Sequence, residues 1–240
     1  EILRCLVGSE MCIRDRIKSY FKDWTMFEKS WLLISSVTMV VLSLMWGDSM
    51  IALLSGLAGI ISVVLCAKGK IENYAFGLFQ AVTYAYICFQ SHIYGEVMYN
   101  ILMVPMIIIG IISWKKNMAD GNGEVKARNL TAKGWVILIV GSIAAVAGYS
   151  FILKLLDGEF ALIDATSTIL SVIATILMLA RYSEQWVMWV IVNMVSVVLW
   201  VMALMNGGEG SVTLLVMWTA YLFNSTYGYI NWRKMAKENA

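Results

Sequence analysis

The sequence predicts an all-α integral membrane protein with eight transmembrane helices. One N-terminal helix is followed by two copies of a three-helix unit, which a linker helix joins. The amino-acid composition indicates a membrane protein. Of the 240 residues, 60% are apolar and only 14% are charged, whereas soluble domains average about 45–50% apolar and about 25% charged residues. The apolar residues gather in eight segments of about eighteen residues or more, enough to cross a bilayer core of about 30 Å. A weak internal repeat gives the arrangement.

The eight segments are residues 29–46, 50–67, 73–91, 95–114, 134–156, 161–180, 185–205 and 211–232. Most connections between them are short, so successive helices must be antiparallel neighbours. Only the polar loop from Lys115 to Lys133 is long, and it divides the chain in half. Pro105 removes one backbone hydrogen bond inside the fourth segment, where it predicts a kink.

The N-terminal stretch Glu1–Arg16 does not resemble the rest of the chain. It lacks an initial Met, a long apolar core and a small-residue cleavage site, so it is not a signal peptide. We interpret residues 1–16 as a non-native remnant and leave them out of the fold. The predicted organisation is a leader and cytoplasmic N-terminus (1–24), an N-terminal helix (25–49), a first repeat (50–116), a loop and linker helix (117–160), a second repeat (161–234) and a tail (235–240).

The distribution of Lys and Arg predicts the orientation. With eight helices both termini lie on one side of the membrane, and that side receives nearly all the Lys and Arg. The opposite side receives one basic residue and five acidic ones, which are Lys154, Asp48, Glu96, Asp157, Glu159 and Glu209. Because cytoplasmic loops are enriched in Lys and Arg, we expect both termini to be cytoplasmic and the protein to lie in the inner (plasma) membrane.

The repeat becomes visible when each residue of the first half is aligned with the residue 113 positions later. Asn73 is then aligned with Trp186. This shift also places Phe76 on Trp189 and Gln80 on Asn193. After a five-residue insertion at residues 206–210, the sequence Trp-Lys-Lys that starts at position 114 matches Trp-Arg-Lys at 232. Three-helix units joined by one linker helix have the same orientation. The SWEET sugar transporters share this parallel symmetry, and transporter sites lie at such repeat interfaces near the midplane.

The seventh segment carries an aromatic and polar stripe on an otherwise apolar helix. At 3.6 residues per turn the stripe consists of Tyr182, Trp186, Trp189, Asn193, Ser196 and Trp200. One interpretation is the wall of a substrate site within the membrane. The other is a packing seam between helices, with Trp186 in the interfacial aromatic belt.

Five further residues are candidates for the same site. Through the repeat, Phe76 and Gln80 are expected to face Trp189 and Asn193. The last helix adds Tyr221 and Asn224, and the fourth helix adds Asn100. For each amide the alternative is a hydrogen bond between helices. Aromatic rings with neutral amides suit a small, flat, polar ligand, including a cation, because the ring quadrupole attracts positive charge.

The residue types and motifs that the sequence lacks exclude several classes of function. Apart from Asp164, no Asp, Glu, Lys or Arg lies deep in a segment, and the lone histidine, His92, belongs to an outer loop. Ion-coupled carriers keep ionisable residues within the membrane, so facilitated diffusion is favoured. The sequence lacks the patterns of a catalytic triad, a metal site or a nucleotide-binding loop. We therefore expect no enzymatic activity, no cofactor, no bound metal and no nucleic-acid partner.

The motif W-x-x-W-x-x-x-N at positions 186–193 resembles the signature of the PnuC-type nicotinamide riboside transporters, and the similarity extends from Trp24 to Trp232. The resemblance implies a SWEET-like fold, a homotrimer in the lipid bilayer, and uptake of nicotinamide riboside down its gradient. A cytoplasmic nucleoside kinase then traps the substrate by phosphorylation. The signature supports only Trp186, Trp189 and Asn193 as site residues.

Two alternatives remain open at this point. Sister families with the same fold carry other flat vitamins such as thiamine, and composition does not separate them. A membrane scaffold without transport activity is the second alternative, which a dry, packed stripe would favour. The chain also departs from the SWEET pattern in its proline content. It has only Pro105, whereas the SWEET proteins carry prolines in several helices.

Overall fold

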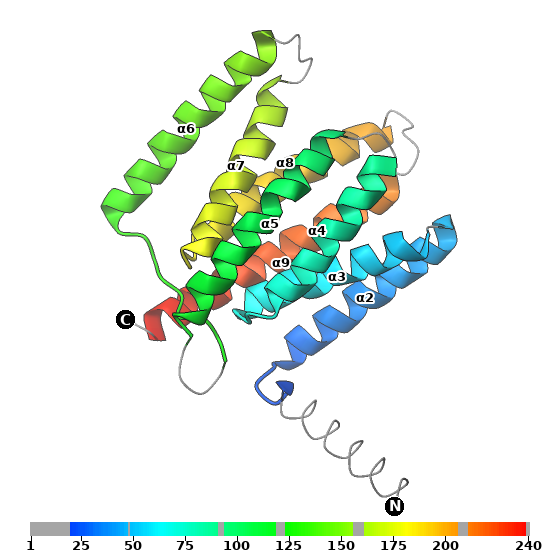
Figure 1. The fold of residues 1–240 in the computed structure, drawn as a ribbon, viewed down its shortest axis with the longest axis horizontal. Coiled ribbons are helices and arrows are strands. Elements are labelled where there is room, and N and C mark those ends of the chain that lie inside the picture. Colours follow the sequence, from blue (N-terminus) through cyan, green and yellow to red (C-terminus); the bar gives the residue numbers. More distant parts are fainter. Residues whose placement is uncertain are drawn as a thin grey trace, which may run out of the picture.

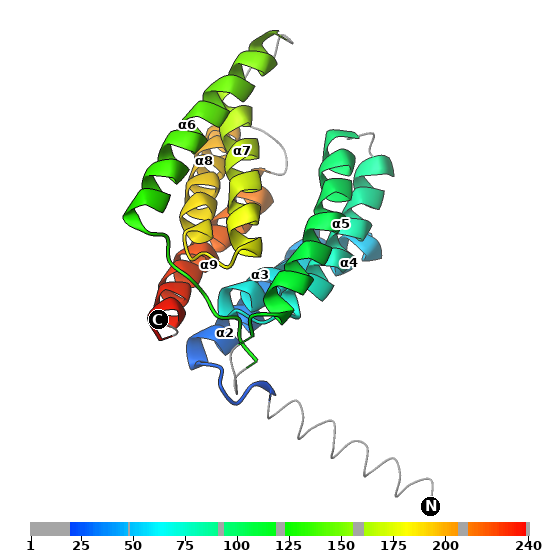
Figure 2. The same cartoon turned by 60° about the vertical axis from the view of Figure 1, so that its left-hand side comes forward.

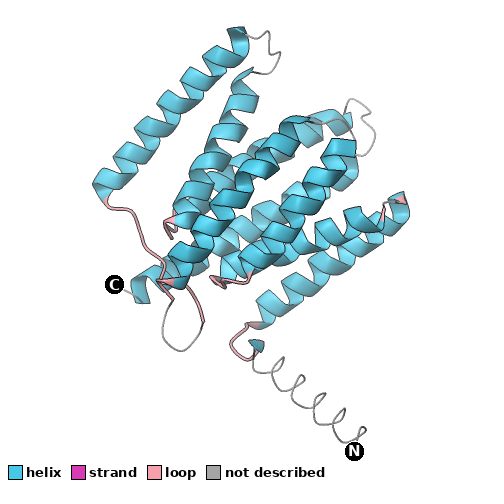
Figure 3. Ribbon diagram, in the orientation of Figure 1, coloured by secondary structure: helices cyan, strands magenta, loops and turns pink. Residues whose placement is uncertain are grey.

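The computed structural model describes residues 20–47, 49–90, 94–118, 123–155, 161–205 and 211–238. Within these residues it contains eight α-helices and no strand, which confirms the all-α prediction (Figure 3). The helices are α2 (Met26–Trp46), α3 (Met50–Lys68), α4 (Asn73–Gln90), α5 (Tyr94–Lys115), α6 (Ala132–Leu155), α7 (Ala161–Leu179), α8 (Gln185–Met205) and α9 (Ser211–Glu238). The stretch 1–16, His92, the insertion at 206–210 and the side chains of Asp164 and Trp200 lie outside the description.

The apolar surface of the helices fits a bilayer. Along the described residues, α2, α3 and α6 are each long and apolar enough to cross a membrane, and α5, α7 and α8 contain shorter apolar stretches. Only 11% of the apolar window of α2 and of α6 is buried in the protein, against 39% for α3. Large apolar side chains such as Leu33 on α2 and Ile137 on α6 are exposed. Helices α2 and α6 therefore lie at the periphery of the described structure and present apolar outer faces.

Local signals define the first helix boundaries. Thr25 and Glu28 form a capping box, in which each side chain accepts a hydrogen bond from the other residue's backbone N–H. Helix α2 ends at Gly47, whose φ of 68° lies in the left-handed region. Ser49 caps α3, and that helix ends at Gly69 with a φ of 77°. A glycine adopts this conformation at little cost, so the helices stop where the sequence places one.

The turns after α3 and after α7 are copies of one another. Each turn closes with the same pair of backbone hydrogen bonds. The bonds are Gly69 N to Cys66 O and Lys70 N to Leu65 O in the first turn, and Arg181 N to Met178 O and Tyr182 N to Leu177 O in the second. Equivalent residues of the two turns lie 112 positions apart in the sequence (181 − 69 and 178 − 66), so the predicted shift of 113 is wrong by one residue here. The sequence alignment paired Lys68 with Arg181 by charge, whereas the fold pairs Gly69 with Arg181, which has a φ of 66°.

The central loop ties the two copies together at one end of the molecule. Val125 N donates to Gly69 O at 2.9 Å, and Arg128 N donates to Arg181 O at 2.8 Å, so the loop binds equivalent residues of both turns. Helices α3 and α7 therefore end on the same side and run in the same direction. We call this side, which carries residues 69–72, 123–131 and 181–184, the loop end.

Two three-helix bundles make up the body of the protein, α3–α5 and α7–α9 (Figures 1 and 2). The bundles meet reciprocally, because α3 contacts α9 and α5 contacts α7. The first helix of each bundle also receives a preceding helix, α2 on α3 and α6 on α7. This exchange of first and last helices is the pattern of a parallel repeat around an axis between the bundles.

A buried ionic cluster attaches α2 to both bundles at the loop end. Lys68 Nζ lies 3.1 Å from Glu28 Oε1 and 3.5 Å from Glu124 Oε1 of the central loop. The Tyr227 hydroxyl of α9 donates to Glu28 Oε1 at 2.5 Å. Glu28 and Lys68 are only 2% and 8% exposed, so each charge depends on the other for its solvation.

We predict that Lys68→Met lowers the melting temperature in detergent, because a buried pair broken on one side costs about 3–5 kcal/mol. The double variant Glu28→Gln with Lys68→Met should recover part of the loss. Lys234→Met is the control, since its pair with Glu238 is 74% and 62% exposed and contributes at most about 1 kcal/mol. Equal melting temperatures for Lys68→Met and Lys234→Met would contradict a structural role for the cluster.

Candidate substrate cavity

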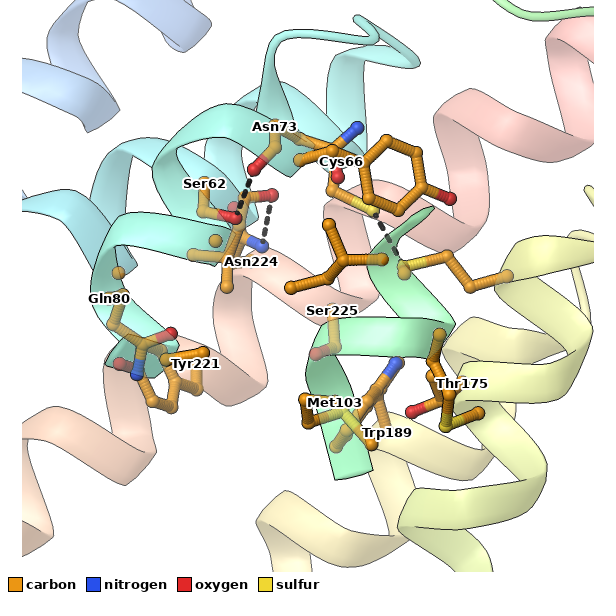
Figure 4. Close-up of a pocket in the computed structure, with 18 of the residues that line it drawn as sticks. Ser62, Cys66, Asn73, Gln80, Met103, Thr175, Trp189, Tyr221, Asn224 and Ser225 are labelled. Carbon is orange, nitrogen blue, oxygen red and sulfur yellow. Dashed lines mark hydrogen bonds between the residues drawn. The ribbon is translucent and has the colours of Figure 1, made fainter. Parts of the chain in front are cut away.

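A cavity of about 320 Å³ lies between the two bundles (Figure 4). All six bundle helices line it, and neither α2 nor α6 contributes a described lining residue. Its volume falls at the lower end of the range of about 300–1,000 Å³ that small-molecule sites occupy. The cavity is therefore the size of one small ligand and sits at the interface of the repeats.

Seven of the eight predicted site residues line this cavity. They are Gln80, Asn100, Trp186, Trp189, Asn193, Tyr221 and Asn224. Phe76 is the exception: it is 37% exposed and does not line the cavity. Their contact with a substrate stays a prediction, but the structure brings the seven together from four helices.

The shift of 112 explains the position of Phe76. On α4 the cavity face runs through residues 73, 74, 77, 80, 81 and 84, and Phe76 points about 100° away from the centre of that face at 100° per residue. Its counterpart in the second bundle is Met188, which packs into the core of that bundle. Gly77 and Ala81 stand where the sequence alignment placed Phe76 and Gln80, opposite Trp189 and Asn193.

Equivalent positions of the two bundles line the cavity with different chemistry. At six pairs of equivalent positions the first bundle carries a small or apolar side chain and the second carries an aromatic or polar one. The pairs are Val63 and Thr175, Gly77 and Trp189, Ala81 and Asn193, Met103 and Tyr221, Met106 and Asn224, and Ile107 and Ser225. The α5–α9 pairs differ by 118 residues, as Trp114 and Trp232 do. Both bundles nevertheless supply amides to the lining, Gln80 and Asn100 from the first and Asn193 and Asn224 from the second.

Two of the cavity amides make hydrogen bonds between helices, as the alternative interpretation of these residues predicts. Asn193 Nδ2 donates to Ser225 Oγ at 2.8 Å. Asn224 Nδ2 donates to the Val63 carbonyl at 3.2 Å, while its Oδ1 is buried without a hydrogen-bond partner. Trp186 Nε1 is likewise buried without a partner. The hydroxyl of Tyr74, which also lines the cavity, has no partner either. Three lining residues thus retain unused hydrogen-bonding groups, and an unmet buried polar group is costly unless a ligand or water satisfies it.

The described lining residues include no Asp, Glu, Lys, Arg or His. Among the described residues there is also no group of three or more His, Cys, Asp or Glu that could hold a metal ion. The predicted neutral character of the site agrees with these residues. Its electrostatics come from ring faces, amides and hydroxyls, which attract a flat cation without a carboxylate.

Sequence reasoning missed several lining residues, among them Ser225, Thr175, Tyr74 and Tyr84. Hydroxyls in transmembrane helices usually bond their own backbone, as the Thr175 hydroxyl does with the Ser171 carbonyl, so they carried no signal. A signal for Tyr74 existed. Glycines at equivalent positions, Gly110 and Gly228, lie against the rings of Tyr74 and Trp186.

A neutral, aromatic cavity between two parallel three-helix bundles with lipid-facing helices around them is the architecture of a small-molecule carrier. The chain belongs to the nicotinamide mononucleotide transporter family, whose model matches residues 49–234. It is therefore a multi-pass membrane transporter.

Similar proteins cover nearly the whole chain. A nicotinamide riboside transporter PnuC from Haemophilus influenzae is 39% identical over 95% of this chain and 99% of that protein. A protein of the same name from Neisseria mucosa is 38% identical, over 93% and 87%. A crystal structure of the vitamin B3 transporter PnuC matches with a TM-score of 0.77 at 38% identity, covering 90% of this chain and 94% of that one.

We predict that Gly228→Ala disturbs the cavity, because the new Cβ would lie 2.6 Å from the ring atoms of Trp186. Overpacking of this kind costs about 1–3 kcal/mol and should lower the melting temperature in detergent. Gly148→Ala on α6 is the control: nothing lies within 4 Å of that Cβ, and alanine is the better helix former by about 1 kcal/mol. A Gly228→Ala protein as stable as the control would disprove the close packing of α9 on Trp186.

Proposed function

We propose that this protein takes up nicotinamide riboside across the inner membrane by facilitated diffusion. The two bundles expose the cavity to each side of the membrane in turn, and a cytoplasmic nucleoside kinase phosphorylates the substrate and retains it. The observation that carries the proposal is the uncharged cavity that holds Trp186, Trp189 and Asn193 together. Relatives named for nicotinamide riboside transport, at 38% and 39% identity, support the choice of substrate.

The chemistry of the riboside matches the cavity group by group. Its pyridinium ring is a flat cation that suits the face of Trp189 or Tyr221. Its carboxamide N–H can donate to Asn224 Oδ1, which lacks a partner. Its ribose hydroxyls suit Asn193 and Ser225, which already bond to each other. The phosphate of nicotinamide mononucleotide would find no Lys or Arg among the described lining residues.

The orientation follows from the loop end, where Lys68, Lys70, Arg128 and Arg181 gather. We propose that this end is cytoplasmic and that both termini lie on that side. The proposed assembly is a homotrimer, in which the exposed apolar faces of α2 and α6 meet lipid or a neighbouring subunit.

Titration calorimetry on the detergent-purified protein tests the substrate, with nicotinamide riboside, nicotinamide mononucleotide and thiamine compared side by side. Binding of the riboside alone, micromolar or tighter, is the expected result. Preference for thiamine would replace the vitamin and keep the carrier. Binding of none of the three would favour the scaffold, although a scaffold does not need a cavity lined by unpartnered polar groups.

We predict that Asn193→Leu weakens riboside binding about thirtyfold or more, because a buried hydrogen bond of about 2 kcal/mol is lost while a side chain branched at Cγ is kept. Ser196→Ala is the control on the same helix, since the Ser196 hydroxyl bonds the Val192 carbonyl and does not line the cavity. Calorimetry with both variants, after gel filtration has shown them to be folded, measures the effect. Normal binding by Asn193→Leu would remove this residue from the site.

We also predict that uptake into proteoliposomes is independent of an imposed pH or sodium gradient when the membrane potential is held at zero. A neutral cavity offers no group to bind a coupling ion. The potential must be clamped because a cation that crosses alone responds to it, by about 2.3 kcal/mol per 100 mV. Accumulation driven by either ion gradient at zero potential would refute facilitated diffusion.

A further inference from the structure

Four aromatic rings form a continuous chain across both bundles between the cavity and the loop end. The ring centroids of Tyr74 and Trp114 are 5.0 Å apart, those of Trp114 and Trp232 are 5.4 Å apart, and those of Trp232 and Trp186 are 6.3 Å apart. Tyr74 and Trp186 line the cavity. Trp114 and Trp232 are 0% exposed and share a core cluster with Val125 of the central loop. This chain closes the cavity on the loop side.

Four hydrogen bonds cross between the bundles at the same level, and they are two copies of one pair. Each bond joins a side chain near the loop end of α5 or α9 to a backbone carbonyl in the last turn of the other bundle's first helix. The bonds are Trp114 Nε1 to Met178 O (2.9 Å), Ser113 Oγ to Leu179 O (2.7 Å), Trp232 Nε1 to Cys66 O (2.9 Å) and Asn231 Nδ2 to Ala67 O (2.9 Å).

The symmetry of these bonds holds residue by residue, although the donor is a hydroxyl in Ser113 and an amide in Asn231. The donors differ by 118 residues (231 − 113 and 232 − 114), and the acceptors differ by 112 (178 − 66 and 179 − 67). The contacts that hold each aromatic ring within its own bundle repeat as well, since Tyr74 packs on Gly110 of α5 and Trp186 on Gly228 of α9. The bundles can therefore separate at this end without change inside either bundle. Separation requires the four crossing bonds to break, together with the nearby Cys66 Sγ–Met178 Sδ contact and the Tyr227–Glu28 hydrogen bond that ties α9 to α2.

We propose that Ser113, Trp114, Asn231 and Trp232 form the gate of the cavity on the loop side, and we call these four residues the tryptophan lock. The proposal rests on the proposed transport function, which requires the cavity to open to this side. Opening breaks the four crossing bonds and separates Trp114 from Trp232. With the loop end in the cytoplasm, the lock controls release of substrate into the cell.

Cys66 is a built-in reporter of this opening. It lines the cavity, is 7% exposed, and its carbonyl accepts the Trp232 bond. In a background with Cys5, Cys12 and Cys88 changed to serine, Cys66 is the only thiol. A membrane-impermeant thiol reagent, applied to vesicles of known sidedness, then measures how often the cavity opens to each side.

We predict that Trp114→Phe and Trp232→Phe each raise the rate at which Cys66 is labelled from the loop side about fivefold. Each substitution removes one hydrogen bond with a net strength of about 1 kcal/mol. The double variant should therefore raise the rate about 25-fold. Labelling from the opposite side should not rise. Trp135→Phe on α6, which removes an indole outside the lock, is the control.

Ser113→Ala with Asn231→Leu provides an independent pair that leaves the aromatic rings in place. It removes the other two bonds and should raise loop-side labelling by a similar factor. Unchanged labelling in both sets of variants, in protein that elutes as folded, would overturn the gate. An equal rise from both sides would also overturn it, because the lock would then be general packing.

Calorimetry with nicotinamide riboside on the same proteins separates this proposal from the proposed function. If the parent binds no riboside and the lock variants still label faster from the loop side, the gate holds and the substrate assignment fails. If the riboside binds and labelling does not change, the carrier holds and the gate lies elsewhere.

Discussion

The carbonyl groups at the ends of α3 and α7 constrain the whole assembly. The last carbonyls of a helix have no partner within it, and a bilayer provides none. Here the turn amides of Gly69 and Arg181 satisfy part of this demand, and side chains from the opposite bundle satisfy the rest. Because each bundle completes the helix ends of the other, the two copies are held parallel and in contact at the loop end, and the cavity lies just above that contact.

The scaffold is symmetric and the cavity is not. Backbone turns, glycine contacts and crossing bonds recur in both bundles, whereas the lining positions have diverged. Gly77 and Ala81 of α4 leave room, while Trp189 and Asn193 at the equivalent positions of α8 fill it with a ring and an amide. A ligand in the cavity therefore meets different side chains on the α4 wall and on the α8 wall.

Much of the site could be predicted from the sequence because its residues are exceptions to their surroundings. Amides, indoles and phenols in apolar helices stand out, and seven of those predicted line the cavity. Phe76 failed because the alignment was one residue out: it matched Lys68 to Arg181 by charge, although the turn is defined by a left-handed residue that is glycine in one copy and arginine in the other. A shift of one residue rotates a helix face by about 100°, enough to exchange Phe76 for Gly77.

By itself the sequence determined the helices, the long central loop and the parallel repeat, because hydrophobicity and helix length are local properties of the chain. It placed the helix boundaries to within about three residues, except that α9 continues to Glu238 beyond the predicted end at 232. It also determined the neutral, aromatic character of the site. Only the tertiary structure decided which helix faces meet, that Ser113 and Asn231 reach the carbonyls of the opposite bundle, and that Asn224 keeps a free acceptor in the cavity. These depend on distances between residues more than one hundred positions apart, and no local pattern encodes them.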